Sequence, residues 1–232
     1  MGHHDNLTRS VFENPRHMRD LLRMVLPHKL VAALDLRTLE LCPGSYVDRE
    51  LKDLQSDLLF SVAARERGHA LVYVLLEHKS WIDRWLPLQL LGYIVRIWER
   101  WRKAHPRERL LPPVLPVVLY HGRRRWRSPR SLSEIIDCAW VGSSIEFLPE
   151  LRILLEDLNV RPDGELERAG TAAVRLALLL LKHASYSADF MQRLVEWARL
   201  LMEVRRLAGG GDLMGDELLR TVSSPCGGAA PK

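Results

Sequence analysis

The stretch that decides the fold runs from Leu71 to Lys79 and reads Leu-Val-Tyr-Val-Leu-Leu-Glu-His-Lys. Six apolar, β-rich residues in a row predict a strand that is buried on both faces. The strand ends in an acid and a base, Glu77 and Lys79, which share one face because strand side chains alternate. Charged groups at the mouth of a buried strand must be paired, solvated or bound to a ligand. The sequence therefore predicts a polar site at the end of this strand.

A second short β-like run, residues 57–62, comes before a polar turn over residues 65–68. The two runs predict an antiparallel hairpin. A register that sends Val62 toward Leu71 sends Asp57 toward residues 76–77, with a tolerance of one or two residues. We therefore expect Asp57, Glu77 and Lys79 at the same end of the hairpin.

Two carboxylates and a lysine at an open strand end can hold Mg²⁺ through oxygen ligands. The metal and the lysine can then orient a water molecule for attack on a phosphodiester and stabilise the charge that develops. Short D…ExK matches are also frequent by chance. A solvated Glu/Lys pair at a strand end is therefore the competing interpretation.

Residues 81–103 follow helical periodicity. The polar residues Gln89, Tyr93, Arg96 and Arg100 lie at i, i+4, i+7 and i+11, which is one helical face. An amide, a phenol and two guanidinium groups in a row suit a phosphate track, and a solvated face is the alternative. We expect the large apolar residues of this segment to pack in the core: Trp81, Trp85, Leu88, Leu91, Val95 and Trp98.

The apolar run Val114–Tyr120 predicts a further strand, with Pro116 indicating an edge or a bulge. His121 follows, as a turn residue or as a group that approaches metal or phosphate. The basic cluster after it is interpreted as a DNA-contacting loop, with an exposed loop that has no partner as the alternative. Its members are Arg123, Arg124, Arg125, Trp126 and Arg127.

The positive charge of the chain is concentrated in one segment. Its 232 residues carry 34 Lys and Arg against 29 Asp and Glu, a net charge of +5. Residues 96–130 hold eleven basic residues against two acids, so this segment alone carries +9, and the rest sums to −4. Residues 131–170 hold nine acids against three bases. A concentrated cationic segment usually faces phosphates or another polyanion.

The coarse order is helix, three strands, helix, strand and then helices, which predicts an α/β core with a helical C-terminal part. We expect a core over residues 1–130, a helical extension packed on it over 131–208, and a flexible tail over 209–232. Helices are expected at 7–26, broken by Pro15, and at 30–36, 132–137, 151–158 and 166–197. No apolar run is long enough to span a bilayer. Three scattered cysteines and no apolar N-terminal signal favour a reducing, cytoplasmic location.

Several motifs, in order and at similar spacing over residues 4–160, resemble those of the Rpn/YhgA-like family of recombination-promoting nucleases and transposases. They are His4-Asp5, Ser56–Phe60, Tyr73–Ser80, Asp83–Trp85 and Pro116–Gly122. The resemblance implies a PD-(D/E)XK nuclease-like core, a mixed central sheet flanked by helices. It also implies Mg²⁺-dependent DNA cleavage, with Mn²⁺ as a substitute, in bacterial recombination or mobile-element biology.

Carried over residue by residue, the resemblance makes Asp57 the motif acid and Glu77 with Lys79 the E-x-K pair. Family members often have Gln where this chain has Lys79, which is closer to the wider superfamily. Asp5 matches the family's His-Asp start and is a candidate further acid, with Glu13 and Asp20 as competitors. Gln89 and Tyr93 resemble the Q-x-x-x-Y helix of exonuclease-like relatives. No residue points to a strand-transfer module.

Three hypotheses follow. The first is a Mg²⁺-dependent DNA endonuclease with Asp57, Glu77 and Lys79 as its catalytic residues. The second is a non-catalytic DNA-binding or scaffold protein that keeps a nuclease-derived fold. The third is an interaction module whose cationic loop docks on its own acidic segment or on a second subunit. The sequence is compatible with a homodimer and predicts DNA, not a membrane, as the partner.

Overall fold

The computed structural model describes residues 9–42, 58–66, 68–77, 83–122, 124–139, 146–183 and 190–207. Five strands form one mixed sheet in the order β1-β2-β3-β4-β5. The strands are β1 (Leu34–Leu41), β2 (Leu58–Ala64), β3 (His69–Glu77), β4 (Val114–Tyr120) and β5 (Leu154–Asp157). The helices are α2 (Pro15–Val25), α3 (His28–Ala33), α4 (Leu86–Ala104), the 3₁₀ turn η3 (Leu132–Glu134), α5 (Asp163–Leu166), α6 (Ala172–His183), α7 (Phe190–Glu196) and α8 (Ala198–Leu207).

The sheet has an antiparallel half and a parallel half. β1, β2 and β3 pair in antiparallel fashion, whereas β3, β4 and β5 run parallel. Helix α4 is the crossover that returns the chain from the end of β3 to the start of β4, as parallel strands require. The three parallel strands therefore end at one edge of the sheet, here called the carboxyl edge.

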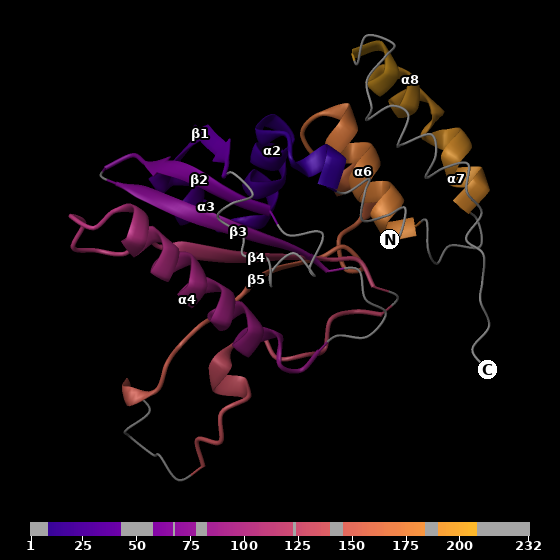
Figure 1. Cartoon of the computed structure of the whole chain (residues 1–232). Coiled ribbons are helices and arrows are strands. Elements are labelled where there is room, and N and C mark those ends of the chain that lie inside the picture. The colour runs from indigo at the N-terminus through magenta and orange to yellow at the C-terminus, as the bar shows by residue number, and fades with distance from the viewer. Residues whose placement is uncertain are drawn as a thin grey trace.

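Helices cover both faces of the sheet, as Figure 1 shows, with α4 on one face and α2 and α6 on the other. Alternation along β4 sends Val117 and Leu119 into the larger apolar cluster with α2 and α6. Val118 and Tyr120 enter a second cluster beneath α4. The predicted mixed α/β sheet flanked by helices is confirmed.

Helix α2 begins and ends where the sequence directs. The Asn14 side chain accepts a hydrogen bond from the Arg16 N–H at 2.9 Å, Pro15 occupies the first turn, and the helix ends before Pro27. Ten of the twelve residues of α6 are buried, which suits its nearly continuous apolar sequence. No helix in the described part of the chain is long and apolar enough to cross a membrane.

An ionic cluster around Asp163 joins α5, α6 and α7. The Asp163 carboxylate lies 2.7 Å from Lys182 Nζ, 3.0 Å from His183 Nε2 and 2.9 Å from Arg193 Nη1. Partial burial pulls the pKa of Asp163 upward, but hydrogen bonds and charge from Lys182 and His183 outweigh it. The pKa of Asp163 therefore lies below its usual value, and its ionised form stabilises this junction.

Two predicted helices are strands. Residues 34–36, expected to continue a helical turn, begin β1 because α3 ends at Ala33. Residues 151–158, expected to be helical, contain β5, which pairs with β4 over Val117–Tyr120. In both segments the conformation is set by pairing with a neighbouring strand. The sequence could not show this, because a short apolar run has no periodicity that distinguishes a strand from a helix.

Pro116 does not mark an edge strand. β4 lies between β3 and β5, and Pro116 pairs with Tyr73 of β3. The pairing with β5 starts only at Val117, so Pro116 lies where β4 has a neighbour on one side. A residue without an N–H is tolerated at such a position. β4 is therefore a central strand, and only its first residues, including Pro116, have a paired strand on one side alone.

Candidate functional site

Glu77 lies at the carboxyl edge of the sheet. It is the last residue of β3 and pairs with Tyr120, the last residue of β4, which in turn pairs with Asp157, the last residue of β5. These three positions form one row across the ends of the parallel strands. Loops beyond such strand ends carry the ligand sites of many α/β sheets. The other predicted catalytic residues, Asp57 and Lys79, lie outside the described residues, as does Asp5.

The hairpin brings the start of β2 to this same edge. Leu58 pairs with Val74, three residues before β3 ends, and Val62 pairs with Ala70. The observed register differs by one residue from the predicted pairing of Val62 with Leu71, which is within the expected tolerance. The predicted hairpin and its turn are confirmed, and the turn contains Gly68 at a φ of 82°.

A hydrogen-bonded clasp holds the basic loop that follows β4 at the carboxyl edge. The Tyr120 hydroxyl donates to the Arg124 carbonyl at 2.8 Å. The Asn159 side-chain amide donates to the Gly122 carbonyl at 2.9 Å. The Asp157 carboxylate accepts the Trp126 N–H at 2.8 Å. The backbone at Gly122, Arg124 and Trp126 is therefore held beside the strands that end in Tyr120 and Asp157.

The clasp is packed as well as hydrogen-bonded. The rings of Tyr120 and Trp126 meet edge to face with centroids 5.1 Å apart, and the Trp126 indole donates to the Ser128 carbonyl at 2.7 Å. A Cβ at Gly122 would overlap the Tyr120 hydroxyl, so a glycine is needed there. His121, between them, is buried. Arg124 and Arg125 are exposed beside this packed core, while Arg123 lies outside the described residues.

Asp157 and Asn159 are site residues that the sequence pattern did not indicate. Both follow an apolar run whose pattern favours a helix, and a helix would not have brought them beside Tyr120. With residues 154–157 interpreted as a strand, Asp-Leu-Asn at its end would have marked polar groups at the carboxyl edge. Asp157 also accepts the Asn159 backbone N–H at 3.0 Å, so the two residues act as one unit.

Helix α4 carries the predicted polar row. Because residues 86–104 form one α-helix, Gln89, Tyr93, Arg96 and Arg100 share a face of it. Gln89 donates to the Asp83 carboxylate at 2.6 Å, and the same carboxylate accepts the Trp85 N–H. Gln89 and Arg96 are exposed, whereas Tyr93 and Arg100 are partly buried. The shared face is confirmed, and its role as a phosphate track stays a prediction.

The predicted core face of α4 is wrong. The buried residues are Leu86, Pro87, Leu90, Ile94 and Ile97. Three of the large apolar residues expected in the core are instead exposed, namely Trp85, Leu88 and Val95. Leu91 and Trp98 are partly buried, and Trp81 lies outside the described residues.

The cationic segment is divided between the two ends of the sheet. α4 starts near the carboxyl edge and runs back along the sheet, as Figure 1 shows. Lys103, Arg107 and Arg109 therefore lie toward the opposite end, and Arg124 and Arg125 return to the carboxyl edge with β4. The cationic segment is therefore not one continuous patch, because in the described part of the chain only the residues after β4 return to the edge that carries Glu77.

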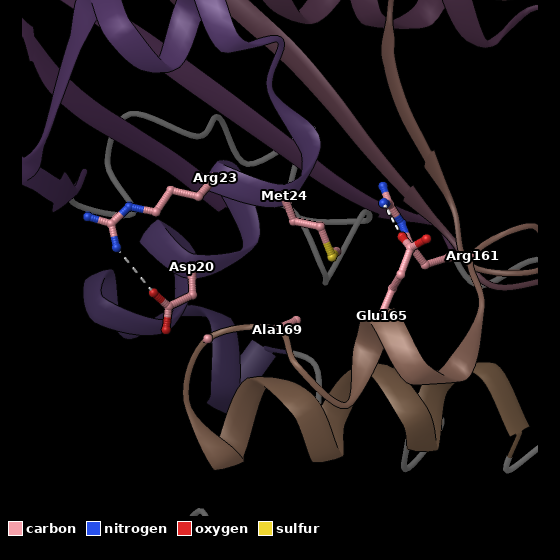
Figure 2. Close-up of a pocket in the computed structure, with 7 residues that line it drawn as sticks. Asp20, Arg23, Met24, Arg161, Glu165 and Ala169 are labelled. Carbon is pink, nitrogen blue, oxygen red and sulfur yellow. Dashed lines mark hydrogen bonds and ion pairs between the residues drawn. The ribbon is translucent and has the colours of Figure 1, made fainter.

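A pocket of about 310 Å³ opens between α2 and the α5–α6 segment, with Asp20 and Arg23 on one side and Arg161 and Glu165 on the other (Figure 2). Asp20 accepts the Thr171 N–H at 3.0 Å and lies near Arg23. Arg161 forms a two-point ion pair with the buried Glu156 at 2.6 and 2.7 Å. Each charged side chain that lines this pocket therefore has an oppositely charged partner within the protein.

The competing N-terminal acids have structural partners. Asp20 is bound at the start of α6, and Glu13 pairs with Arg9. Among the residues that the structure describes, no group of three or more His, Cys, Asp and Glu side chains is arranged to hold a metal ion. A metal site at the carboxyl edge would therefore draw on Glu77 together with residues outside the described ranges.

The protein is thus a mixed α/β protein whose polar residues Glu77, Tyr120 and Asp157 lie at the ends of its parallel strands, beside the basic loop. Comparison with known families then gives its relationship. The family described as "Putative transposase, YhgA-like" matches residues 2–209, so the chain belongs to the Rpn/YhgA-like family, as the sequence motifs predicted. No solved structure matches the chain.

Three similar relatives come from Escherichia coli. The recombination-promoting nuclease RpnD of strain O157:H7 is 34% identical over 78% of this chain and 67% of its own length. The recombination-promoting nuclease RpnA of strain K12 is 30% identical over 85% of this chain and 65% of its own length. The inactive nuclease-like protein RpnE of strain K12 is 29% identical over 78% of this chain and 58% of its own length. The chain thus spans about two thirds or less of these relatives.

Proposed function

We propose that this protein is a Mg²⁺-dependent DNA endonuclease with a PD-(D/E)XK nuclease-like core. The observation that carries the proposal is the row formed by Glu77, Tyr120 and Asp157, because it joins the motif glutamate to the clasped arginine loop. The nuclease names of RpnD and RpnA support the same activity.

The proposed roles follow from the chemistry of each group. Asp57 and Glu77 would hold Mg²⁺ through carboxylate oxygens, and the bound ion would supply Lewis-acid stabilisation of the attacked phosphate. The position of Glu77 supports this role, because it is the last residue of β3 and lies in the row at the ends of the parallel strands. Lys79 would orient the attacking water and stabilise charge on the phosphate oxygens. Arg123, Arg124 and Arg125 would bind the DNA backbone, as would the row on α4.

The test is nicking of supercoiled plasmid with Mg²⁺, repeated with Mn²⁺ and with EDTA. The parent should nick with either metal and not with EDTA. Asp57→Ala, Glu77→Ala and Lys79→Ala should each lower the rate by at least about 100-fold, the scale of a lost catalytic group. Glu150→Ala and Lys29→Ala remove exposed charges away from the carboxyl edge and should leave the rate near that of the parent. Variants that cleave as fast as the parent would refute the assignment.

A second function has a specific observation in its favour. One relative, RpnE, is named inactive, so a protein that is 29% identical to this chain is described as lacking the nuclease activity. A DNA-binding scaffold would bind DNA with a steep salt dependence and would not nick plasmid with either metal. The nicking assay and a binding assay in EDTA, run on the same preparation, separate the two functions.

A further inference from the structure

One strip of the outward face of α4 carries large apolar side chains that nothing in the described structure covers. Trp85 is 53% exposed, Leu88 52% and Val95 42%. The core side of the same helix is filled by a different set, which includes Leu90 and Ile94. Large apolar side chains gathered on one outer face mark an interaction surface more often than a solvated one.

The spacing on this face is that of a helix-pairing seam. Trp85, Leu88, Gly92, Val95 and Glu99 are separated by three, four, three and four residues. This is the a/d pattern by which one helix packs along another. The buried residues on the opposite side of α4 already pack against the sheet. The a/d pattern therefore indicates a second packing contact on the exposed side of the helix.

Gly92 in the middle of the seam is not explained by the fold of the chain itself. A glycine weakens a helix interior relative to alanine. A Cβ built at Gly92 would have no atom within 4 Å, so the fold leaves room for a side chain there. Close approach of another helix, which a side chain would block, accounts for a glycine at this position.

We propose that this face, here called the α4 seam, packs against the α4 seam of a second copy of the chain, with the two helices antiparallel about a two-fold axis. In this arrangement Leu88 packs over Gly92 of the second copy, and Val95 meets Trp85 of the second copy. Each contact occurs twice, because a two-fold interface must be self-complementary.

The charges at the two ends of the seam favour a second copy as the occupant. Arg84 lies two residues before α4, Glu99 lies near the other end of the helix, and both are exposed. Antiparallel pairing brings Glu99 of one copy within a helical turn of Arg84 of the other, at both ends of the seam. Parallel pairing would set like charges side by side. Such rim charges fix the orientation of an interface.

The first test measures mass in solution by sedimentation equilibrium, over a range of concentrations and without DNA. The parent should have twice the chain mass of 26.7 kDa, and Leu88→Arg should have the chain mass. Met202→Arg places the same charge on an exposed apolar position of α8 and should remain dimeric. A parent that stays monomeric at its highest soluble concentration, or Leu88→Arg that stays dimeric, would overturn the proposal.

The second test exchanges the rim charges. Arg84→Glu and Glu99→Arg should each weaken the dimer at low salt, and the double variant should regain most of the affinity. Gly92→Ala should raise the melting temperature of the monomer and yet weaken the dimer. A double variant that is no tighter than the single ones would overturn the antiparallel seam. These measurements need no cleavage, so they stand whether or not the protein is a nuclease.

Discussion

Asp157 is the residue that holds the carboxyl edge together. Its buried carboxylate accepts N–H groups from Trp126 and from Asn159, and Asn159 in turn holds the Gly122 carbonyl. Asp157, at the end of β5, and Asn159, in the turn after it, thereby fix a loop that lies more than thirty positions earlier in the chain. The loop conformation depends on these few polar contacts and not on the apolar core alone.

We expect Asp157→Ala to destabilise the protein by about 1–3 kcal/mol, because it leaves buried N–H groups without an acceptor. Urea unfolding followed by circular dichroism measures this change. The control, Glu150→Ala, removes an exposed acid from the same stretch of chain and should change stability by less than about 0.5 kcal/mol. Equal stabilities of the two variants would show that the clasp contributes nothing.

At the scale of the element, the junction of α5, α6 and α7 depends on one carboxylate. Asp163 meets Lys182, His183 and Arg193, and its pKa is below the usual value of 3.8. A lowered pKa in the folded state means that the carboxylate stabilises the fold fully above its unfolded pKa. That contribution is lost as the pH falls through the folded value.

We therefore expect the stability advantage of the parent over Asp163→Asn to be full near pH 6 and to shrink as the pH falls below about 4. Urea midpoints for both proteins between pH 6 and pH 3 measure it. Glu150→Gln is the control, because Glu150 is an exposed acid outside this junction. An Asp163→Asn difference that is constant with pH would contradict the assigned charge.

The elements differ in how far the sequence predicts them. The hairpin of β2 and β3 and the helix α4 follow from composition and periodicity, and all three are observed. β5 could not be predicted, because four residues with two apolar members become a strand only through pairing with β4. The sequence places Trp85, Leu88 and Val95 in the core although they are exposed, because large apolar residues suit either side of a helix. The polar unit of Asp157 and Asn159 was missed together with β5.

At the scale of the whole molecule, the division of the positive charge sets a length for the proposed DNA partner. The 19 residues of α4 span about 28 Å at 1.5 Å per residue. That distance equals about 8 base pairs at 3.4 Å each. A duplex bound at the carboxyl edge must therefore extend along α4 before it meets Lys103, Arg107 and Arg109.

We expect the combined variant Lys103→Ala, Arg107→Ala and Arg109→Ala to bind a duplex of about 8 base pairs as the parent does, and a duplex of about 20 more weakly. For the longer duplex, the slope of log K against log salt should fall by about 0.9 for each phosphate that the variant no longer neutralises. Arg124→Ala with Arg125→Ala should weaken binding to both lengths. Fluorescence anisotropy in EDTA measures all of these affinities without cleavage. An equal weakening at both lengths would refute this path for the DNA.

The late position of β5 has a consequence for the order of synthesis. A ribosome produces the strand that ends in Glu77 long before it produces Asp157, and the basic loop emerges between the two. Until Asp157 and Asn159 follow, the loop lacks the acceptor and donor that fix its shape. The contacts that fix the basic loop therefore become available only after the last described strand has been synthesised.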